Sequence, residues 1–249
     1  MVEAAVDTFG SALAAERAGV GRIELCADLN DGGTTPSAGF IAGAAARLRI
    51  PVFALIRPRG GDFIYSDDEF DVMRRDIDVA GSVGARGYAT GALKPDYTID
   101  TARITSLVRA AGQLPVTFHR AFDYAPDLAV ALEQVIDCGV ARVLTSGGAR
   151  TAVEGAGVIA RLVSQAGSRI GIVAGGGVRE SNIREIIART GVREVHAGIG
   201  SVVAGASPPI DRGITLRKPF PPGDMARVEL DEKRMRKLVD LADSRSTST

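Results

Sequence analysis

The chain has 249 residues, 45% of them hydrophobic and 24% charged, which is an ordinary composition for a soluble globular protein. Its 30 Lys and Arg balance its 30 Asp and Glu, so it lacks the basic excess of a nucleic-acid-binding protein. No apolar run approaches the roughly 18 residues of a membrane span, and the first residues lack the pattern of a secretory signal. We therefore expect a cytoplasmic protein whose two cysteines, Cys26 and Cys138, stay reduced.

Short apolar runs recur along the chain and predict eight β-strands. Four of them open with a glycine, a small apolar residue and a short polar stretch, at residues 19–24, 84–89, 139–144 and 191–196. Each of these glycines follows an apolar-periodic stretch, as the C-cap of a helix does. The other four runs lie at residues 2–6, 51–56, 115–119 and 169–174. Such apolar runs are typical of strands buried on both faces.

The stretches between the strands predict helices. Ser66 with Glu69, and Thr151 with Glu154, have the spacing of capping boxes that would open the third and sixth helices. Strict alternation of strand and helix indicates a parallel sheet. Eight such units in a chain of this length predict closure into a (β/α)₈ TIM barrel, and a doubly wound open sheet is the alternative.

The end of the chain breaks this alternation. Residues 201–230 are rich in proline and glycine and predict mostly loop. Residues 231–241 predict a closing helix, and the polar tail 244–249 predicts disorder. No linker marks a second domain, so residues 1–243 are expected to form one.

The two histidines, His119 and His196, each stand at the C-terminal end of a predicted strand. In a TIM barrel the C-terminal ends of all strands meet at one mouth, where this fold carries out its chemistry. We therefore predict that both imidazoles face one pocket as catalytic groups. The alternative is a hydrogen-bonded structural role for each.

Glu24 occupies the same place in its repeat as His196 does in its own. Because alternate strands of a barrel contribute side chains to common layers, these two residues are expected to meet. The carboxylate would then orient the imidazole or raise its pKa, and Glu3 on the first strand would add a second carboxylate. The predicted acid–base groups are Glu24, His119 and His196. Alternatively, the carboxylates only pair with arginines inside the barrel.

Three arginines follow strand ends, Arg57 and Arg59 after the third strand and Arg120 after the fifth, where Asp123 lies close by. Guanidinium groups bind carboxylate and phosphate in a bidentate way, so these residues predict a small anionic substrate. Arg–Asp pairs that stiffen long loops are the equally weighted alternative.

Glycine-rich turns follow the sixth and seventh strands, with Ser146 in the first turn and Gly175, Gly176 and Gly177 in the second. Loops near the end of a TIM barrel commonly bind phosphate through backbone N–H groups. These four residues are therefore predicted to contact the anion, although a tight turn alone also calls for glycine.

Long, distinctive blocks of sequence lie at residues 22–27, 32–36, 56–63, 65–67, 73–74, 115–123, 142–148, 152–155 and 175–177. Together these blocks resemble the CutC family of copper homeostasis proteins. The resemblance covers roughly residues 2–198. It implies a TIM barrel, a cytoplasmic setting, a homo-oligomer (a dimer or a tetramer) and a role in copper handling. It also implies a Cu(I) site built from cysteines, as in some members.

The chain departs from those copper-binding members at the cysteine positions. Cys26 matches one family cysteine, but Ala5 stands at the position on the first strand, and Gly148 and Ala197 stand at two later ones. Since Cu(I) favours several sulfur ligands, Cys26 alone is weak support for a metal site. The polar residues at the predicted mouth, by contrast, are typical of an enzyme pocket.

The sequence therefore supports three functions. The resemblance favours copper binding and homeostasis. The residues at the strand ends favour an enzyme that acts on a small phosphorylated or carboxylated, sugar-like substrate by His/Glu acid–base chemistry. The third is a non-catalytic scaffold.

Overall fold

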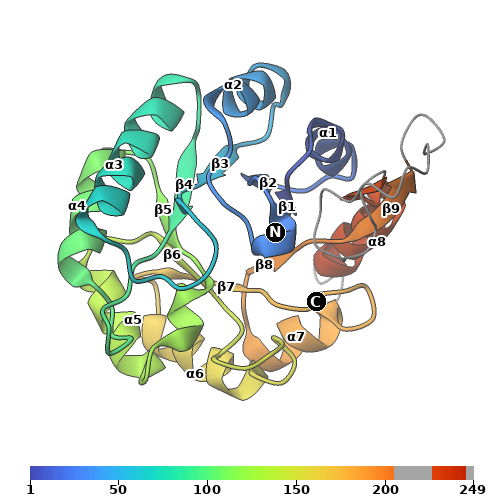
Figure 1. Ribbon diagram of the computed structural model, residues 1–249. Coiled ribbons are helices and arrows are strands. Elements are labelled where there is room, and N and C mark those ends of the chain that lie inside the picture. The colour runs from blue at the N-terminus through green and yellow to red at the C-terminus, as the bar shows by residue number, and fades with distance from the viewer. Residues whose placement is uncertain (205–225, 245–249) are drawn as a thin grey trace, which may run out of the picture.

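The computed structural model describes residues 1–204 and 226–244 and shows eight parallel strands closed into a barrel inside a ring of helices (Figure 1). The strands are β1 Val2–Val6, β2 Arg22–Leu25, β3 Val52–Leu55, β4 Gly87–Thr90, β5 Val116–Phe118, β6 Arg142–Thr145, β7 Gly171–Ala174 and β8 Glu194–Ala197. Each strand pairs with the next, and β1 also pairs with β8. The predicted TIM barrel is confirmed, and the open sheet is excluded.

Helices cover the outside of the barrel. They are α1 Phe9–Arg17, α2 Ala38–Arg47, α3 Asp67–Ser82, α4 Thr101–Ala111, α5 Leu128–Asp137, α6 Ala156–Ala166 and α7 Ile183–Thr190. Each buries one apolar face against the strands, as Met73, Ile77 and Ala80 of α3 show. Two short 3₁₀ helices, η1 Leu29–Asp31 and η2 Arg120–Tyr124, lie in the loops that follow β2 and β5.

One of the two predicted capping boxes is confirmed. Ser66 accepts a hydrogen bond from the Glu69 backbone, and the Glu69 side chain accepts one from the Ser66 backbone. The box at Thr151 is wrong, because α6 begins five residues later at Ala156 and Glu154 pairs with Arg150 instead. The N-cap of α6 is Gly155, where only glycine fits, because a Cβ there would lie 1.8 Å from the Ser146 carbonyl oxygen.

The C-terminal part adds a ribbon and a helix to the barrel. Strands β9 Gly200–Ala204 and β10 Ala226–Leu230 pair antiparallel, so the prediction of mostly loop for residues 201–230 is wrong at both ends. The breakers that suggested loop lie at residues 205–225, outside the described residues. Helix α8, Glu232–Asp243, confirms the closing helix and packs against α1 and α7 (Figure 1). The predicted tail lies outside the described residues apart from Ser244.

Among the described residues, no helix is both long enough and apolar enough to cross a bilayer.

Candidate functional site

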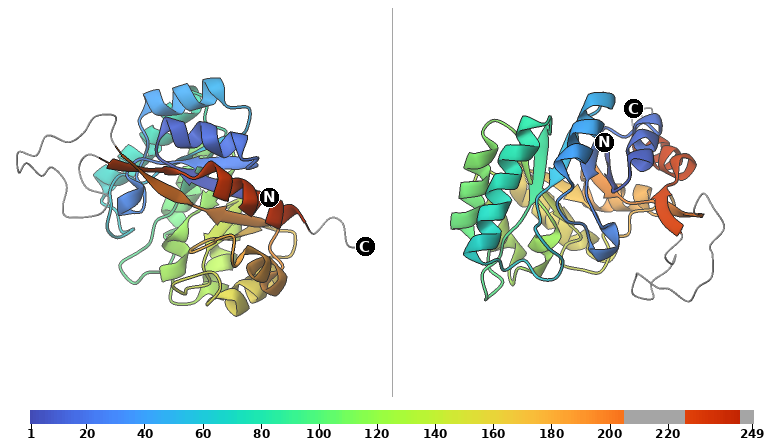
Figure 2. Two further views of the ribbon diagram at one scale, coloured as in Figure 1. Left: turned by 90° about the vertical axis from the view of Figure 1, so that its right-hand side faces the viewer. Right: turned by 45° about the horizontal axis from the view of Figure 1, so that its top comes forward.

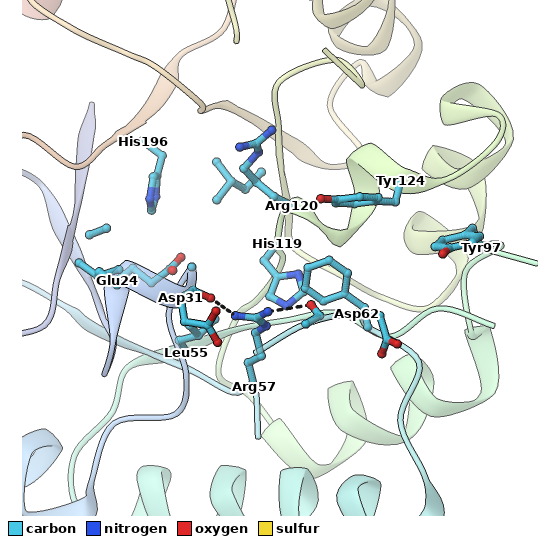
Figure 3. Close-up of a pocket in the computed structure, with 16 residues that line it drawn as sticks. Glu24, Asp31, Leu55, Arg57, Asp62, Tyr97, His119, Arg120, Tyr124 and His196 are labelled. Carbon is cyan, nitrogen blue, oxygen red and sulfur yellow. Dashed lines mark hydrogen bonds between the residues drawn. The ribbon is translucent and has the colours of Figure 1, made fainter. Parts of the chain in front are cut away.

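A cavity of about 520 Å³ opens at the C-terminal ends of the strands (Figure 3). Glu24, His119 and His196 line it together with Arg57 and Arg120. The rest of the wall is Ala5, Leu29, Asp31, Gly32, Leu55, Gly61, Asp62, Phe63, Tyr97, Tyr124 and Leu144. The structure thus brings both histidines to one pocket, as the strand ends predicted.

Glu3, Glu24 and His196 form a buried cluster on one side of this cavity. Strand β1 lies between β2 and β8, and Glu3 is in register with His196 on β8. His196 Nδ1 lies 2.7 Å from Glu3 Oε1, and one ligand atom from each of the three residues lies within 4.8 Å of the others. The predicted meeting of Glu24 with His196 and Glu3 is therefore present.

The charges of this cluster shift its acid–base properties. Burial alone would raise the pKa of Glu3, but the hydrogen bond and charge of His196 and the charge of Arg22 lower it to about 2. Burial alone would lower the pKa of His196, yet the Glu3 hydrogen bond and the two carboxylates raise it. Burial raises the pKa of Glu24. The pair of Glu3 and His196 is thus a carboxylate with a proton-retaining imidazole.

Arginines below the cluster neutralise Glu3 but do not bond to Glu24. Arg22 Nε donates to Glu3, and its Nη2 donates to Glu194 Oε2 at 2.8 Å. Arg142 Nε lies 3.4 Å from the same Glu194 oxygen. Arginine pairing inside the barrel therefore accounts for Glu3, whereas the recorded side-chain partner of Glu24 among the described residues is Cys26.

His119 sits in a different environment. It directly follows β5 and is the N-cap of η2, where its Nδ1 accepts a hydrogen bond from the Ala121 backbone N–H at 3.2 Å. Its ring lies 5.0 Å from the ring of Phe63 and 6.1 Å from that of Phe118, between centroids. Burial, with the nearby charge of Arg57, lowers the pKa of His119 to about 3. This imidazole stays neutral near pH 7, and the pKa of His196 is shifted in the opposite direction.

The arginines predicted to bind the anion divide into three cases. Arg57 lies on the cavity wall, but its guanidinium donates to backbone carbonyls of Asp31, Gly33 and Gly61 at 2.7 to 2.9 Å, which ties two loops together (Figure 3). Arg59 lies off the wall and pairs with Glu69 and Asp62. Arg59 thus makes the ion pairs of the loop-stiffening alternative and is not among the residues that line the cavity.

Arg120 is the arginine that remains available to a ligand. It lines the cavity with 43% of its side chain exposed. Its Nε donates to Asp123 Oδ2 at 2.8 Å and its Nη2 to Ser146 Oγ at 2.7 Å. Asp123 also accepts from the backbone N–H groups of Ser146 and Gly148 at 3.0 Å. Asp123 and Ser146 therefore position Arg120 from outside the cavity wall.

The glycines after β7 do not line the cavity either. A Cβ on Gly175 would lie 2.5 Å from Leu144 Cδ1, and one on Gly176 would lie 3.4 Å from Arg120 Cζ. Gly176 and Gly177 have φ angles of +94° and +73°. The close approach to Leu144 and Arg120 and the left-handed backbone explain these glycines, so the predicted phosphate loop is not part of the wall.

Cys26 is fully buried and directly follows the C-terminal end of β2. Its Sγ lies 3.5 Å from Glu24 Oε1, and burial together with the Glu24 charge raises the pKa of the thiol well above its usual value. Ala5 is in register with Glu24 on the neighbouring strand. The other cysteine, Cys138, caps α5 and donates to the Thr101 carbonyl at 3.6 Å. The two thiols of the chain therefore do not form one site.

Sequence reasoning missed several residues of the site. Arg22 lies two residues before Glu24, so strand periodicity alone places it on the same face. Asp31 reaches the wall from η1, Tyr97 from the loop between β4 and α4, and Tyr124 from η2. No local pattern marks such loop residues, because their position depends on how the loops fold over the mouth.

Comparison with known proteins agrees with the resemblance seen in the sequence. The family model described as the CutC family matches residues 1–201. The chain belongs to the CutC family. A CutC-family protein of Xanthomonas campestris is 46% identical over 228 residues, covering 91% of this chain and 95% of that protein. A mouse protein named copper homeostasis protein cutC homolog is 47% identical over 201 residues, and the match covers 81% of this chain and 74% of the mouse protein.

Solved structures support the same assignment. The crystal structure described as CutC from Streptococcus agalactiae matches with a TM-score of 0.76 at 36% identity, over 80% of this chain and 97% of that one. Phosphoribosylanthranilate isomerase from Thermotoga maritima matches with a TM-score of 0.58 at 13% identity, over 98% of both chains. At that identity the second match shows the shared barrel alone.

Proposed function

We propose that this CutC-family protein takes part in copper homeostasis, and that its molecular activity is proton transfer on a small anionic compound bound in the cavity. The role rests on the relatives, among them the mouse protein named for copper homeostasis. The activity rests on the cavity. A cytoplasmic setting is part of the proposal, since both cysteines are free and buried apart from one another.

One observation carries the proposed activity. Glu24, His119 and His196 line one cavity while their surroundings shift their pKa values in different directions. Neighbouring groups whose pKa values are shifted in different directions are typical of sites where one group acts as the acid and another as the base. Glu24 and His196 lie close enough to exchange a proton with the same ligand atom. Arg120 supplies the positive charge for an anionic group.

A thiolate Cu(I) site does not fit the residues present. Cu(I) favours soft sulfur ligands, and Cys26 is a single buried thiol with a raised pKa. The cluster of Glu3, Glu24 and His196 offers oxygen and nitrogen donors, which suit Cu(II) or another divalent ion better. Glu3 already holds His196 Nδ1, the arrangement in which a carboxylate orients a metal-bound histidine. The metal candidate within this chain is therefore the Glu24–His196 side of the cluster.

A ligand screen tests the proposed activity. A compound that binds only the folded protein raises its melting temperature, so sugar phosphates and sugar acids are screened by thermal shift. We expect hits whose stabilisation is lost in Arg120→Gln and kept in Arg75→Gln, a change on the exposed face of α3. Failure of every phosphorylated or carboxylated compound to shift wild type would contradict an anionic ligand.

Metal titration tests the copper role separately. Cu(I) binding is compared between wild type and Cys26→Ser with a reductant present, and Cu(II) binding is compared between wild type and Glu24→Gln without reductant. We expect Cu(I) binding to be weak and unchanged by Cys26→Ser, and Cu(II) binding to fall in Glu24→Gln. Tight Cu(I) binding that disappears in Cys26→Ser would contradict the conclusion that a thiolate Cu(I) site does not fit the residues present.

A further inference from the structure

We propose that His119 is a neutral hydrogen-bond donor to the oxygen of a substrate carbonyl group, and that the substrate is an anionic α-hydroxy carbonyl compound. The inference rests on the proposed proton transfer and names the substrate class of that site. It replaces the expected acid–base role of His119 with an electrophilic one. The acid–base work then falls to Glu24 and His196.

The backbone selects the tautomer of His119. Its Nδ1 accepts a hydrogen bond from the Ala121 N–H, the free donor at the start of η2. A nitrogen that accepts carries no proton, so in the neutral ring the proton is on Nε2. The hydrogen bond at Nδ1 therefore leaves the Nε2–H free to donate to another group.

That donor has no partner among the described residues. His119 Nε2 is buried without a hydrogen bond, and the residue as a whole is 6% exposed. A buried donor left unsatisfied is costly, and native proteins rarely keep one without a reason. His119 lines the cavity, so a ligand oxygen there would satisfy it. The chemical match is an acceptor oxygen, which a protonated amine does not have, and an enolate oxygen is the strongest such acceptor because it is charged.

The remaining groups lie across the cavity from His119. Strand β5 is opposite β1 in the eight-stranded ring, and the Glu24–His196 cluster belongs to β2 and β8 on either side of β1. Figure 3 shows His119 beside Arg57 on one side and Glu24 with His196 on the other. A carbonyl oxygen at His119 therefore leaves the adjacent carbon facing the acid–base pair. Arg120, which also lines the cavity, binds the anionic end of the substrate.

The reaction that this arrangement serves is a proton shift. The Glu24 carboxylate removes the proton from the carbon next to the carbonyl group. The electrons of that C–H bond form a C=C bond, and the carbonyl π electrons move to oxygen, giving an enediolate that accepts the His119 Nε2–H bond. For an isomerisation, Glu24 returns the proton to the former carbonyl carbon, while His196 protonates the former carbonyl oxygen and takes the hydroxyl proton from the adjacent carbon, where the new C=O bond forms. For an epimerisation, the original C=O bond re-forms and His196 delivers a proton to the other face of the same carbon. The net result is an isomerisation or an epimerisation, with no oxidant, reductant or co-reactant.

Nitrogen NMR tests the state of His119 directly, since the chain contains only two histidines. We expect the His119 imidazole to remain neutral from pH 8 to pH 5 with the proton on Nε2. Assignment uses His196→Gln. A His119 signal that titrates near pH 6, or one with the proton on Nδ1, overturns the inference without touching the role of Glu24.

Ligand binding tests the donor role. Phosphoglycolohydroxamate, whose planar oxygens copy an enediolate, is compared by calorimetry with glycerol 3-phosphate, which has the phosphate alone. His119→Phe keeps the ring and loses the donor, and we expect it to weaken hydroxamate binding about 10- to 100-fold, as for a hydrogen bond to a charged group. Binding of glycerol 3-phosphate should be unchanged, and His119→Gln should restore part of the loss. Equal loss for both probes, or no loss, overturns the inference.

Deuterium exchange separates this inference from the proposed function. Wild type is incubated in D₂O with dihydroxyacetone phosphate, and incorporation at the α-carbon is followed by proton NMR. We expect exchange to be lost in Glu24→Gln and to slow strongly in His119→Phe. Exchange that needs Glu24 but not His119 refutes the inference alone. Exchange independent of Glu24, or no exchange and no probe binding in wild type, refutes the proton transfer and the inference together.

Discussion

At the scale of single residues, Glu3 is the buried charge on which the site depends. It is 1% exposed, and its two oxygens contact Arg22 and His196. Removing one partner of a buried ion pair leaves an uncompensated charge. We expect Arg22→Met to lower the free energy of unfolding by about 3–5 kcal/mol, measured by urea denaturation at pH 7. Arg75→Met, which removes an exposed pair on α3, should change it by less than about 1 kcal/mol. Similar losses for the two variants would contradict a buried charge network.

His119 makes its own residue-scale contribution to the pH dependence of stability. Its folded-state pKa of about 3 lies below the ordinary value of 6.5. The unfolded chain therefore binds a proton that the folded chain does not as pH falls below 6.5. The contribution of neutral His119 to the free energy of unfolding is complete above pH 6.5 and is lost as pH falls toward 3. By pH 5 the loss is about 2 kcal/mol.

Replacing His119 by Phe should therefore flatten the stability profile between pH 7 and pH 5, as measured by denaturation at each pH. Glu3 does not interfere in this window, since its lowered pKa removes stability only as pH falls from 4.5 to about 2. The raised pKa of His196 changes the pH dependence of stability in the opposite direction, and it does so in wild type and in His119→Phe alike. Equal slopes for wild type and His119→Phe would contradict a buried neutral ring.

At the scale of elements, the start of α3 joins a helix cap to the loop that covers the cavity. Glu69 accepts from the Ser66 backbone and also pairs with Arg59 of the preceding loop. Loss of an N-cap side chain costs about 1 kcal/mol, so Ser66→Ala should lower the free energy of unfolding by that amount. Ser168→Ala, at an exposed turn, is the control. A loss no larger than that of Ser168→Ala would show that the cap does not stabilise α3.

At the scale of the whole molecule, the antiparallel ribbon of β9 and β10 stands beside the barrel next to α8 (Figure 2). Val202 and Val228 face each other in register and are 64% and 40% exposed. We propose that this apolar pair contributes to the homo-oligomer that the family resemblance implies. Light scattering after gel filtration should show an oligomer for wild type and a smaller species for Val202→Ser/Val228→Ser.

Val130 on α5, which is 54% exposed, provides the matched control for this experiment. Val130→Ser should leave the assembly unchanged. A wild-type monomer, or an equal effect of Val130→Ser, would refute the assignment of the ribbon as the contact.

The sequence predicted most of the fold because its signals are local. Apolar runs, helix-capping glycines and the box at Ser66 depend on a few neighbouring residues, and all of them correspond to elements of the barrel. The box at Thr151 failed because α6 starts only at Ala156 and the Glu154 side chain pairs with Arg150, and the local spacing of Thr151 and Glu154 does not show either fact. The ribbon was missed because its partner strands are separated by 21 residues, 205–225, rich in breakers.

The sequence by itself determined that Glu24, His119 and His196 lie at one mouth, because strand direction and side-chain alternation follow from local order. Only the tertiary structure decided their chemistry. Burial and the charge of Arg57 keep His119 neutral, the Ala121 N–H fixes its tautomer, and the hydrogen bond to Glu3 raises the pKa of His196. It also decided that Arg120 remains open to a ligand while Arg59 does not. Protonation and pairing depend on burial and on neighbours brought together from distant strands and loops, and these exist only once the barrel has closed.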